Sequence, residues 1–436
     1  MSTSNWARNL TYSSSRVVRP TTLDELAETV TSSPRVRPLG TRHSFNRVAD
    51  TDGVHVVVDA LDDGRPAVEV DVARGTASIA AGARYGEASQ ALQEQGVALG
   101  AMASLPHISV AGAVATATHG SGDTTRNLAA AVRGLELVTA DGAVRTLARG
   151  DTDFAGAVVG LGALGIVTRL ELDVVPTYDV RQDVYLGLGW DVVAEQLDEI
   201  TASATSVSLF TGWGDGVDQV WRKTAVRPGS DAVAFPAAYL GAAAATRAMH
   251  PLPGVDAAAC TEQLGVAGPW NERLPHFRLA FTPSNGEELQ SEYLVPRRHA
   301  VEAMAALRKI ADVVRPLLQI TEIRTIAADD LWMSTAFVEG VAAGEQPDPR
   351  AGFVGFHFTW LPRQREVEAV LPAIESALAP FGARPHWGKL FTDGPAELAD
   401  VAGRYPRFAD FAALVERYDP AGRFRGGIVD TLLAGA

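Results

Sequence analysis

The chain has very little cysteine: Cys260 is the only one among 436 residues. A single thiol cannot build a disulfide framework, and proteins without one belong by default in a reducing compartment. The first 19 residues are polar and lack the apolar core of a secretory signal. We therefore expect a cytoplasmic protein whose fold depends on its core rather than on covalent crosslinks.

Positive charge is also scarce, since 38 Lys and Arg residues face 52 Asp and Glu residues, for a net charge of −14. A nucleic-acid partner requires a basic face, and an anionic membrane surface attracts basic segments. The longest apolar run, Ala155 to Val167, is rich in glycine and too short to span a bilayer. We therefore expect neither nucleic acid nor membrane as a partner.

Several catalytic signatures are missing as well. The sequence has no H-E-x-x-H, C-x-x-C, G-x-S-x-G or Walker A motif. His107 and His119 have no partners at metal-ligand spacing, so we predict no metal site. Residues 160–165 do match G-x-G-x-x-G, but residues 166–175 alternate as a β-strand does. The dinucleotide fingerprint needs a helix there, so the match does not indicate a nicotinamide-binding Rossmann site.

The sequence does contain an alternation of short strands, turns and helices. Apolar residues make up 47% of the chain, enough for a large core, and the length fits two or three domains of about 150 residues each. This mixture predicts an α+β fold, and the character of the sequence changes after Pro176. We expect helices at 23–30, 85–95, 297–315 and 367–378, strands at 35–39, 54–61, 166–175, 318–325 and 352–360, and hairpins within 68–81 and 135–148.

Two stretches in the first half have an unusual composition. Residues 40–46 read Gly-Thr-Arg-His-Ser-Phe-Asn, a glycine that permits close backbone approach followed by hydrogen-bonding side chains. Alone, this stretch is better explained as a polar surface turn. Residues 109–122 carry almost only small side chains. Their backbone either packs closely against another helix or lies against a flat cofactor and its pyrophosphate.

Three polar segments follow in the second half. Glu322 and Arg324 alternate on one expected strand, and His357 and Thr359 on another, so each pair projects to one face. Residues 384–389 add an arginine, a histidine and a lysine around a tryptophan. Each segment alone is explained by a salt bridge or a pair on a sheet surface. Together they would suit an uncharged, hydroxyl-rich ligand, because a hydroxyl can donate to a carboxylate and accept from a guanidinium.

The order of these segments identifies a family. The 40–46 loop, residues 103–122, Gly-Ala-Leu-Gly-Ile-Val-Thr at 162–168, Glu-Ile-Arg-Thr, His-Phe-Thr-Trp and Arg-Pro-His-Trp-Gly-Lys follow one another along the chain. The combination resembles the vanillyl-alcohol oxidase superfamily of FAD-dependent oxidoreductases, in particular its alditol (xylitol/sorbitol) oxidase branch. The resemblance covers nearly the whole chain.

The resemblance implies an α+β fold with a two-subdomain FAD-binding domain of the vanillyl-alcohol oxidase (PCMH) type. A substrate-binding cap domain, built on an antiparallel sheet with flanking helices, is expected to accompany it. The implied division is 1–177 for the FAD-binding domain, 178–388 for the cap, and 389–436 for a C-terminal segment that returns to the FAD-binding domain.

Roles for individual residues also come from the resemblance. His43 is expected to hold FAD through a covalent 8α-histidyl bond. The positions expected to bind the polyol are Ser104, Glu322, Arg324, Thr359 and Lys389, and the catalytic base is left open between Lys389 and His357. The positions expected to contact FAD are Gly40, Thr41, Arg42, His43, Ser44, Phe45, Asn46, Ser104, Ser109, Gly112, Ala113, Val114, Ala115, Thr116, Ile166 and His386.

The implied activity is oxidation of the terminal CH–OH of sugar alcohols to the aldose, with oxygen reduced to hydrogen peroxide. The expected partners are a small polyol and oxygen, and we expect a monomer. The rivals are an aldonolactone oxidase or dehydrogenase of the same superfamily, a flavin- or sugar-binding protein without turnover, and a metal hydrolase.

Three features depart from the family pattern. Arg42 stands where relatives usually carry glycine, and Arg425 follows Phe424 where an asparagine is common. The loop at 339–352 is longer than expected, and we predict that it alters which polyols fit.

Overall fold

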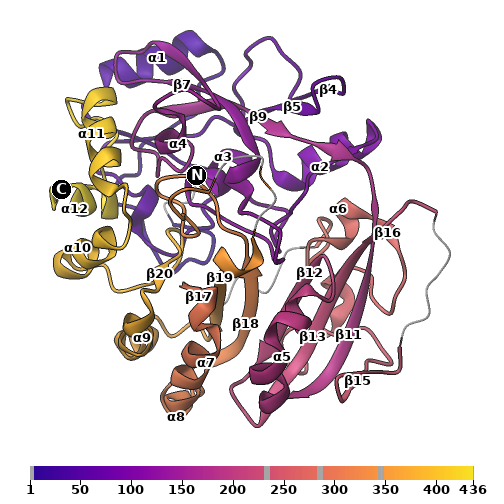
Figure 1. The fold of residues 1–436 in the computed structure, drawn as a ribbon. Coiled ribbons are helices and arrows are strands. Elements are labelled where there is room, and N and C mark those ends of the chain that lie inside the picture. Colours follow the sequence, from indigo (N-terminus) through magenta and orange to yellow (C-terminus); the bar gives the residue numbers. More distant parts are fainter. Residues whose placement is uncertain (1–3, 230–235, 282–287, 342–344, 346–347, 436) are drawn as a thin grey trace.

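Two large β-sheets organise the protein (Figure 1). The computed structural model describes residues 4–229, 236–281, 288–341, 345 and 348–435. One sheet has five strands and the other ten, and smaller sheets of three and two strands accompany them. Within these residues, no helix combines the length and the apolar character needed to cross a membrane.

The chain begins with a small parallel sheet in the order β1-β3-β2. Parallel strands need a crossover connection, which α1 (Leu23–Ser32) supplies between β1 (Val17–Val18) and β2 (Val36–Pro38), the two outer strands of this sheet. The N-terminus of α1 is capped, since the Thr22 side chain accepts a hydrogen bond from the backbone N–H of Glu25. The strand expected at 54–61 is only β3 (Val54–Val56), because its two partners are themselves two and three residues long.

The five-stranded sheet is antiparallel, in the order β4-β5-β9-β7-β8. Both predicted hairpins are confirmed, as is the strand after the G-x-G-x-x-G segment, which excludes the Rossmann arrangement there. The strands are β4 (Val68–Asp71), β5 (Thr76–Ala80), β7 (Val132–Val138), β8 (Val144–Ala148) and β9 (Ile166–Asp173). Three short helices accompany them: α2 (Tyr85–Glu94), α3 (Val110–Ala115) and α4 (Phe154–Ala157).

The second sheet runs in the order β14-β15-β11-β13-β12-β18-β19-β17-β20, and β16 pairs with β11. The two strands predicted from their polar pairs are confirmed as β18 (Leu318–Ile326) and β19 (Phe353–Trp360), which lie side by side. The others are β11 (Asp179–Gly189), β12 (Ser206–Thr211), β13 (Gly216–Val226), β14 (Ala238–Tyr239), β15 (Ala242–Ala244), β16 (Gly268–Pro269), β17 (Leu289–Pro296) and β20 (Arg384–Pro385).

Helices α5 (Trp190–Ala202), α7 (Ala300–Lys309) and α9 (Gln364–Leu378) accompany the second sheet (Figure 1). The single helix predicted at 297–315 is wrong. A 3-10 turn, Arg297–His299, precedes α7, and Ile310 separates α7 from α8 (Ala311–Val314). Ile310 leaves helical geometry, with ψ at 12°, and its side chain packs against the main hydrophobic core.

The C-terminal helices α10 (Pro395–Gly403), α11 (Phe408–Tyr418) and α12 (Gly427–Ala434) lie beside the N-terminal elements, in yellow in Figure 1. The backbone N–H of Val36 donates to the Arg423 carbonyl at 2.7 Å, and the Arg35 guanidinium lies 2.8 Å from Asp430. On these contacts we propose that the segment from 389 onward belongs with the FAD-binding half of the chain. Part of the 339–352 loop falls outside the described residues.

The first and second halves of the chain meet at a buried junction. The N–H of Gly122 donates to the Thr325 carbonyl at 2.8 Å, which joins the end of the small-residue segment to β18. Beside it, the buried Arg297 donates to the carboxylates of Asp123 and Asp198. A buried guanidinium thus fixes the first half of the chain against the second.

This junction predicts a stability effect. Replacing Arg297 with methionine leaves Asp123 as a buried, uncompensated charge, so we expect the free energy of unfolding to fall by about 3–5 kcal/mol. Urea denaturation followed by tryptophan fluorescence measures the change. The control is Arg363→Met, which removes an exposed ion pair at 3.5 Å and should cost less than about 1 kcal/mol. Equal, small losses in both variants would contradict the role of Arg297 in joining the two halves of the chain.

Candidate functional site

A cavity of about 850 Å³ lies between the two halves of the chain. This volume is within the roughly 300–1,000 Å³ range of ligand and cofactor sites. One part of its wall is formed by residues 39–45, 111–116, 160–162 and 164–167. The other part is the polar face of the second sheet. Apart from Asn46, each residue that the sequence predicts to contact FAD or polyol lines this cavity, as does His357.

Asn46 has a different task. Its side-chain amide donates to the carbonyls of Trp387 at 2.9 Å and Lys389 at 2.8 Å, and its oxygen accepts from the N–H of Val48. Asn46 does not line the cavity, and its side chain has a structural role. It ties the 40–46 loop to the segment that carries Lys389.

The glycines of the cofactor-side wall are required by close packing. A Cβ on Gly40 would lie 2.5 Å from Ser109 Oγ, and one on Gly112 would lie 2.7 Å from the same atom. The N–H of Ser109 also donates to Thr41 Oγ1 at 3.1 Å. The 40–46 loop and the start of α3 are therefore held together with their backbones at the cavity wall, which leaves room for a flat, bulky group.

His43 has the properties of an attachment point. Its Nδ1 lies 3.1 Å from Thr41 Oγ1, its Nε2 is buried with no hydrogen-bond partner among the described residues, and Trp6 stacks on its ring at 5.1 Å. Burial, with His107 and Arg84 nearby, lowers the pKa of His43 to about 4. The imidazole is thus neutral at pH 7, the state in which a ring nitrogen is a nucleophile.

Arg42 adopts a backbone conformation that favours glycine, the residue that the family pattern leads us to expect there. Its φ is 65°, in the left-handed region that residues with a Cβ rarely occupy. The chain keeps an arginine at a position whose geometry favours glycine, while its carbonyl accepts from the N–H of Trp6 at 2.8 Å.

The polar face of the second sheet follows from strand alternation and register. Glu322 of β18 and Glu292 of β17 both lie opposite His357 of β19, so the three form one row across the sheet. Gln290 and Thr359 pair in the neighbouring row. Alternate residues of a strand share a face, so the predicted pairs do project to the same side, and they line the cavity.

Glu292 is the main residue that sequence reasoning missed. It has no exposed surface, and its carboxylate lies 2.9 Å from Arg324 Nη2, 3.2 Å from His119 Nε2 and 3.4 Å from Lys389 Nζ. Although burial opposes the charged form, Arg324, His119 and Lys389 hold its pKa well below the ordinary value. The available signal was the alternation of Gln290 and Glu292 in a strand that leads into Tyr-Leu-Val.

His119, Glu292 and His386 also present ligand atoms within 4.8 Å of one another, a grouping that could hold a metal ion. Two cations already face the same carboxylate, Arg324 and Lys389. They would repel a divalent ion, and the Nδ1 of His386 is occupied as the acceptor of the Gly388 N–H at 3.0 Å. The grouping is better described as a charge-compensated carboxylate.

Gln290 contacts both candidate bases, Lys389 and His357, and fixes their orientation. Its side-chain N–H donates to Glu288 at 2.6 Å, so its oxygen points to Lys389 Nζ at 2.8 Å and His357 Nε2 at 3.1 Å. A carbonyl oxygen can only accept, so His357 carries its proton on Nε2 and keeps the Nδ1 lone pair. Burial and Lys389 place the pKa of His357 well below its ordinary value, so the ring is neutral.

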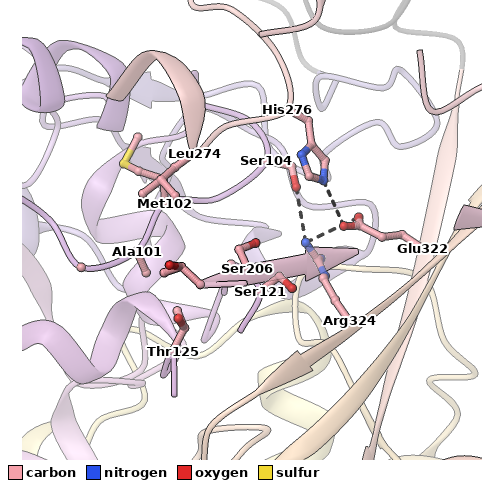
Figure 2. Close-up of a pocket in the computed structure, with 13 residues that line it drawn as sticks. Ala101, Met102, Ser104, Ser121, Thr125, Ser206, Leu274, His276, Glu322 and Arg324 are labelled. Atoms are coloured by element: carbon pink, nitrogen blue, oxygen red, sulfur yellow. Dashed lines mark hydrogen bonds and ion pairs between the residues drawn. The ribbon is translucent and has the colours of Figure 1, made fainter. Parts of the chain in front are cut away.

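A smaller cavity of about 20 Å³ adjoins the first and shares Ser104, His276, Glu322 and Arg324 with it (Figure 2). Arg324 donates to Ser104 Oγ at 3.3 Å and lies 3.6 Å from Glu322, whose other oxygen is 3.0 Å from His276 Nε2. His276 lies in a loop and is a further residue that the sequence did not indicate. The carboxylate and the guanidinium thus separate the two cavities.

Comparisons with known proteins agree with this geometry. The family model described as FAD binding domain matches residues 14–148, and the one described as D-arabinono-1,4-lactone oxidase matches residues 283–432. Solved structures of a solvent-stable cholesterol oxidase and of cholesterol oxidase from B. sterolicum superpose with TM-scores of 0.75 and 0.73. They cover 99% of this chain, and 97% and 96% of their own, at 16% and 14% identity, which shows a shared fold.

Fold, cavity and family model define an FAD-binding oxidoreductase of the vanillyl-alcohol oxidase type, as the sequence predicted. An alditol oxidase of Streptomyces sp. is 46% identical over 99% of both chains. The chain therefore belongs to the alditol oxidase family. A more distant relative is the L-gulono-1,4-lactone dehydrogenase of Mycobacterium tuberculosis, 29% identical over 96% of this chain and 95% of its own.

The buried imidazoles predict a pH dependence of stability. Burial and Lys223 lower the pKa of His276 from 6.5 to about 4, so below pH 6.5 the unfolded chain takes up a proton that the folded chain does not. Folded-state stability then decreases as the pH falls from 6.5 toward 4, by up to about 1.4 kcal/mol per pH unit for one proton.

We expect the stability difference between wild type and His276→Gln to shrink by about 2 kcal/mol between pH 7.5 and pH 5.0, because only the wild type loses this contribution. Urea denaturation of the holoenzymes at both pH values measures it. A difference that stays constant would show that His276 is not held neutral.

Proposed function

We propose that this protein is an FAD-dependent alditol oxidase, which converts the terminal CH–OH of a sugar alcohol such as xylitol or sorbitol to the aldehyde of the aldose and reduces oxygen to hydrogen peroxide. The observation that carries the proposal is the buried Glu322–Arg324 pair on the wall of a cavity whose other wall is cofactor-binding backbone. The Streptomyces relative named alditol oxidase supports the substrate class.

FAD fits the cofactor-side wall, because the close packing of Gly40 and Gly112 with Ser109 exposes backbone there and His43 offers an unpartnered ring nitrogen. When bound, FAD supplies the hydride acceptor for the carbinol carbon and, once reduced, the electrons for oxygen. We infer that His43 holds it by a covalent 8α-histidyl bond. The neutral state of His43 supports this inference.

The sheet face would bind and orient the polyol. Glu322 accepts a hydrogen bond from a substrate hydroxyl while Arg324 donates to it or to its neighbour, and Ser104 and Thr359 extend the set. A linear polyol carries adjacent hydroxyls that match such alternating donors and acceptors. The pair thereby converts binding into orientation of the reacting carbon.

We assign the base to His357 rather than Lys389. The proton on His357 Nε2 is donated to Gln290, so Nδ1 is the atom whose lone pair takes the hydroxyl proton as hydride leaves C1. Lys389 donates to Gln290 and lies beside Glu292, which suits an ammonium that stabilises the developing alkoxide.

The buried, unpaired Cys260 supports a reducing, cytoplasmic setting.

The polyol site gives a kinetic prediction. Glu322→Gln and Arg324→Met should each lower kcat/KM for xylitol and sorbitol by at least about a hundredfold, because one partner of a buried, substrate-facing pair is lost. Steady-state peroxide detection measures this, with bound flavin quantified in parallel. Arg363→Met, far from the cavity lining, is the control. Near-normal kinetics in both variants would contradict the site assignment.

The same assay separates the rival activity, since the relative named L-gulono-1,4-lactone dehydrogenase makes aldonolactones reasonable alternative substrates. Turnover of lactones without turnover of polyols would replace the proposal.

The cofactor bond gives a second prediction. Acid precipitation of the wild type should leave the yellow colour in the pellet, whereas His43→Ala should release it into the supernatant. Ser44→Ala is the matched control in the same loop, and its flavin should stay with the pellet. Acid-stable flavin in His43→Ala would show that another residue holds it.

A further inference from the structure

A buried lysine stands behind the polyol-binding face. Lys223 of β13 is 1% exposed, and its Nζ donates to the carbonyls of Arg273, Leu274 and Pro275 at 2.9, 2.6 and 2.9 Å. Three carbonyls can only accept, and an ammonium has three N–H groups to give them. Lys223 therefore holds the 273–276 loop in place through hydrogen bonds from one buried ammonium group.

The fourth neighbour of this ammonium is His276, whose Nδ1 lies 3.1 Å from Lys223 Nζ. A proton on Nδ1 would face the cation, so the imidazole proton lies on Nε2 and is donated to Glu322 Oε1 at 3.0 Å. Burial lowers the pKa of Lys223 to about 7, and the negative charge of Glu322 partly opposes this shift. The Glu322 carboxylate is therefore the charge that balances the Lys223 ammonium, with the His276 imidazole between them.

The His276 ring is held in this orientation from the side. Trp221 and Phe210 make edge contacts with it at 5.2 and 5.7 Å, at interplanar angles of 70° and 63°. Two aromatic rings and a lysine thus surround the imidazole on the sides that do not face Glu322. In Figure 2 its Nε2 points at Glu322.

The same loop also holds Ser104. The backbone N–H groups of His276 and Phe277 donate to the Ser104 carbonyl at 3.1 and 3.4 Å, and Arg324 donates to Ser104 Oγ at 3.3 Å. Two of the proposed polyol contacts, Ser104 and Glu322, therefore depend on one loop whose shape is set by Lys223.

We propose that His276, oriented by Lys223, is a positioning residue that fixes the Glu322 carboxylate and so sets the recognition of one substrate hydroxyl. Glu322 Oε1 is taken by His276, and Oε2, 3.6 Å from Arg324 Nη1, is left for the ligand. A hydroxyl bound there must donate to one oxygen and accept from one guanidinium nitrogen. This deepens the proposed function and rests on it.

The test compares substrates rather than total activity. In the wild type, kcat/KM for xylitol should exceed that for the 2-deoxy or 3-deoxy polyol that lacks the recognised hydroxyl by at least a hundredfold. In His276→Phe, which keeps the volume but lacks the donor, this ratio should fall at least tenfold. The loss should come from xylitol, with the deoxy polyol changed less than threefold. His276→Gln, whose amide can replace Nε2–H, should recover most of the ratio.

Lys223→Met should reproduce the effect of His276→Phe and add nothing to it in the double variant. Arg222→Met is the matched control on the same strand, because Arg222 bonds to Ser203 instead of the 273–276 loop. Its ratio should equal that of the wild type. An unchanged ratio in His276→Phe, or a parallel loss on both polyols, would overturn the proposal.

A double-mutant cycle distinguishes this proposal from the proposed function. His276→Phe and Glu322→Gln should be non-additive in kcat/KM, with His276→Phe costing less than threefold in a protein that already carries Glu322→Gln. If the wild type oxidises a lactone and no polyol, the proposed function fails, and the cycle on the lactone still decides the role of His276. Full additivity would overturn it on either substrate.

Discussion

The site depends on one buried negative charge. Removing a carboxylate from water costs several kcal/mol unless cations compensate it, and Glu292 has no exposed surface. Its compensating groups come from three separate places in the chain: β18, the segment after α3 and the segment after β20. The charge therefore requires these three parts to meet. Buried pairs of this kind contribute little net stability, so their effect here is to define the geometry of a single arrangement.

A second carboxylate, Glu322, repeats this logic with different partners. Where Glu292 is surrounded by groups that also face the cavity, Glu322 is contacted by His276, and His276 is contacted in turn by the buried Lys223, which does not line the cavity. The pKa values of both carboxylates are lowered despite burial, by Arg324 in each case and by the histidines beside them. Arg324 thus lies between two negative charges, which fixes its guanidinium without committing all its N–H groups.

Sequence reasoning predicted the parts of the molecule that have a local signature. Alternation gave the faces of β18 and β19, the turn residues gave both hairpins, and the strand after residues 160–165 excluded a Rossmann site. The missed groups, Glu292, Gln290 and His276, lie on strands or loops whose neighbours are remote in sequence. Glu292 and Gln290 owe their roles to pairing between β17, β18 and β19, and His276 owes its role to the packing of a loop against β18, neither of which a local pattern specifies. The broken helix at Ile310 was likewise decided by packing.

The cavity has two walls of different chemical nature, and this has an evolutionary consequence. The cofactor side is mostly backbone and small side chains, so few substitutions fit there without collision. The opposite side is a sheet whose alternate side chains can be exchanged while the ladder of main-chain hydrogen bonds stays intact. Substrate preference can therefore diverge through substitution of a few residues on adjacent strands. The relative named L-gulono-1,4-lactone dehydrogenase, 29% identical over almost the full length of both chains, fits such a history.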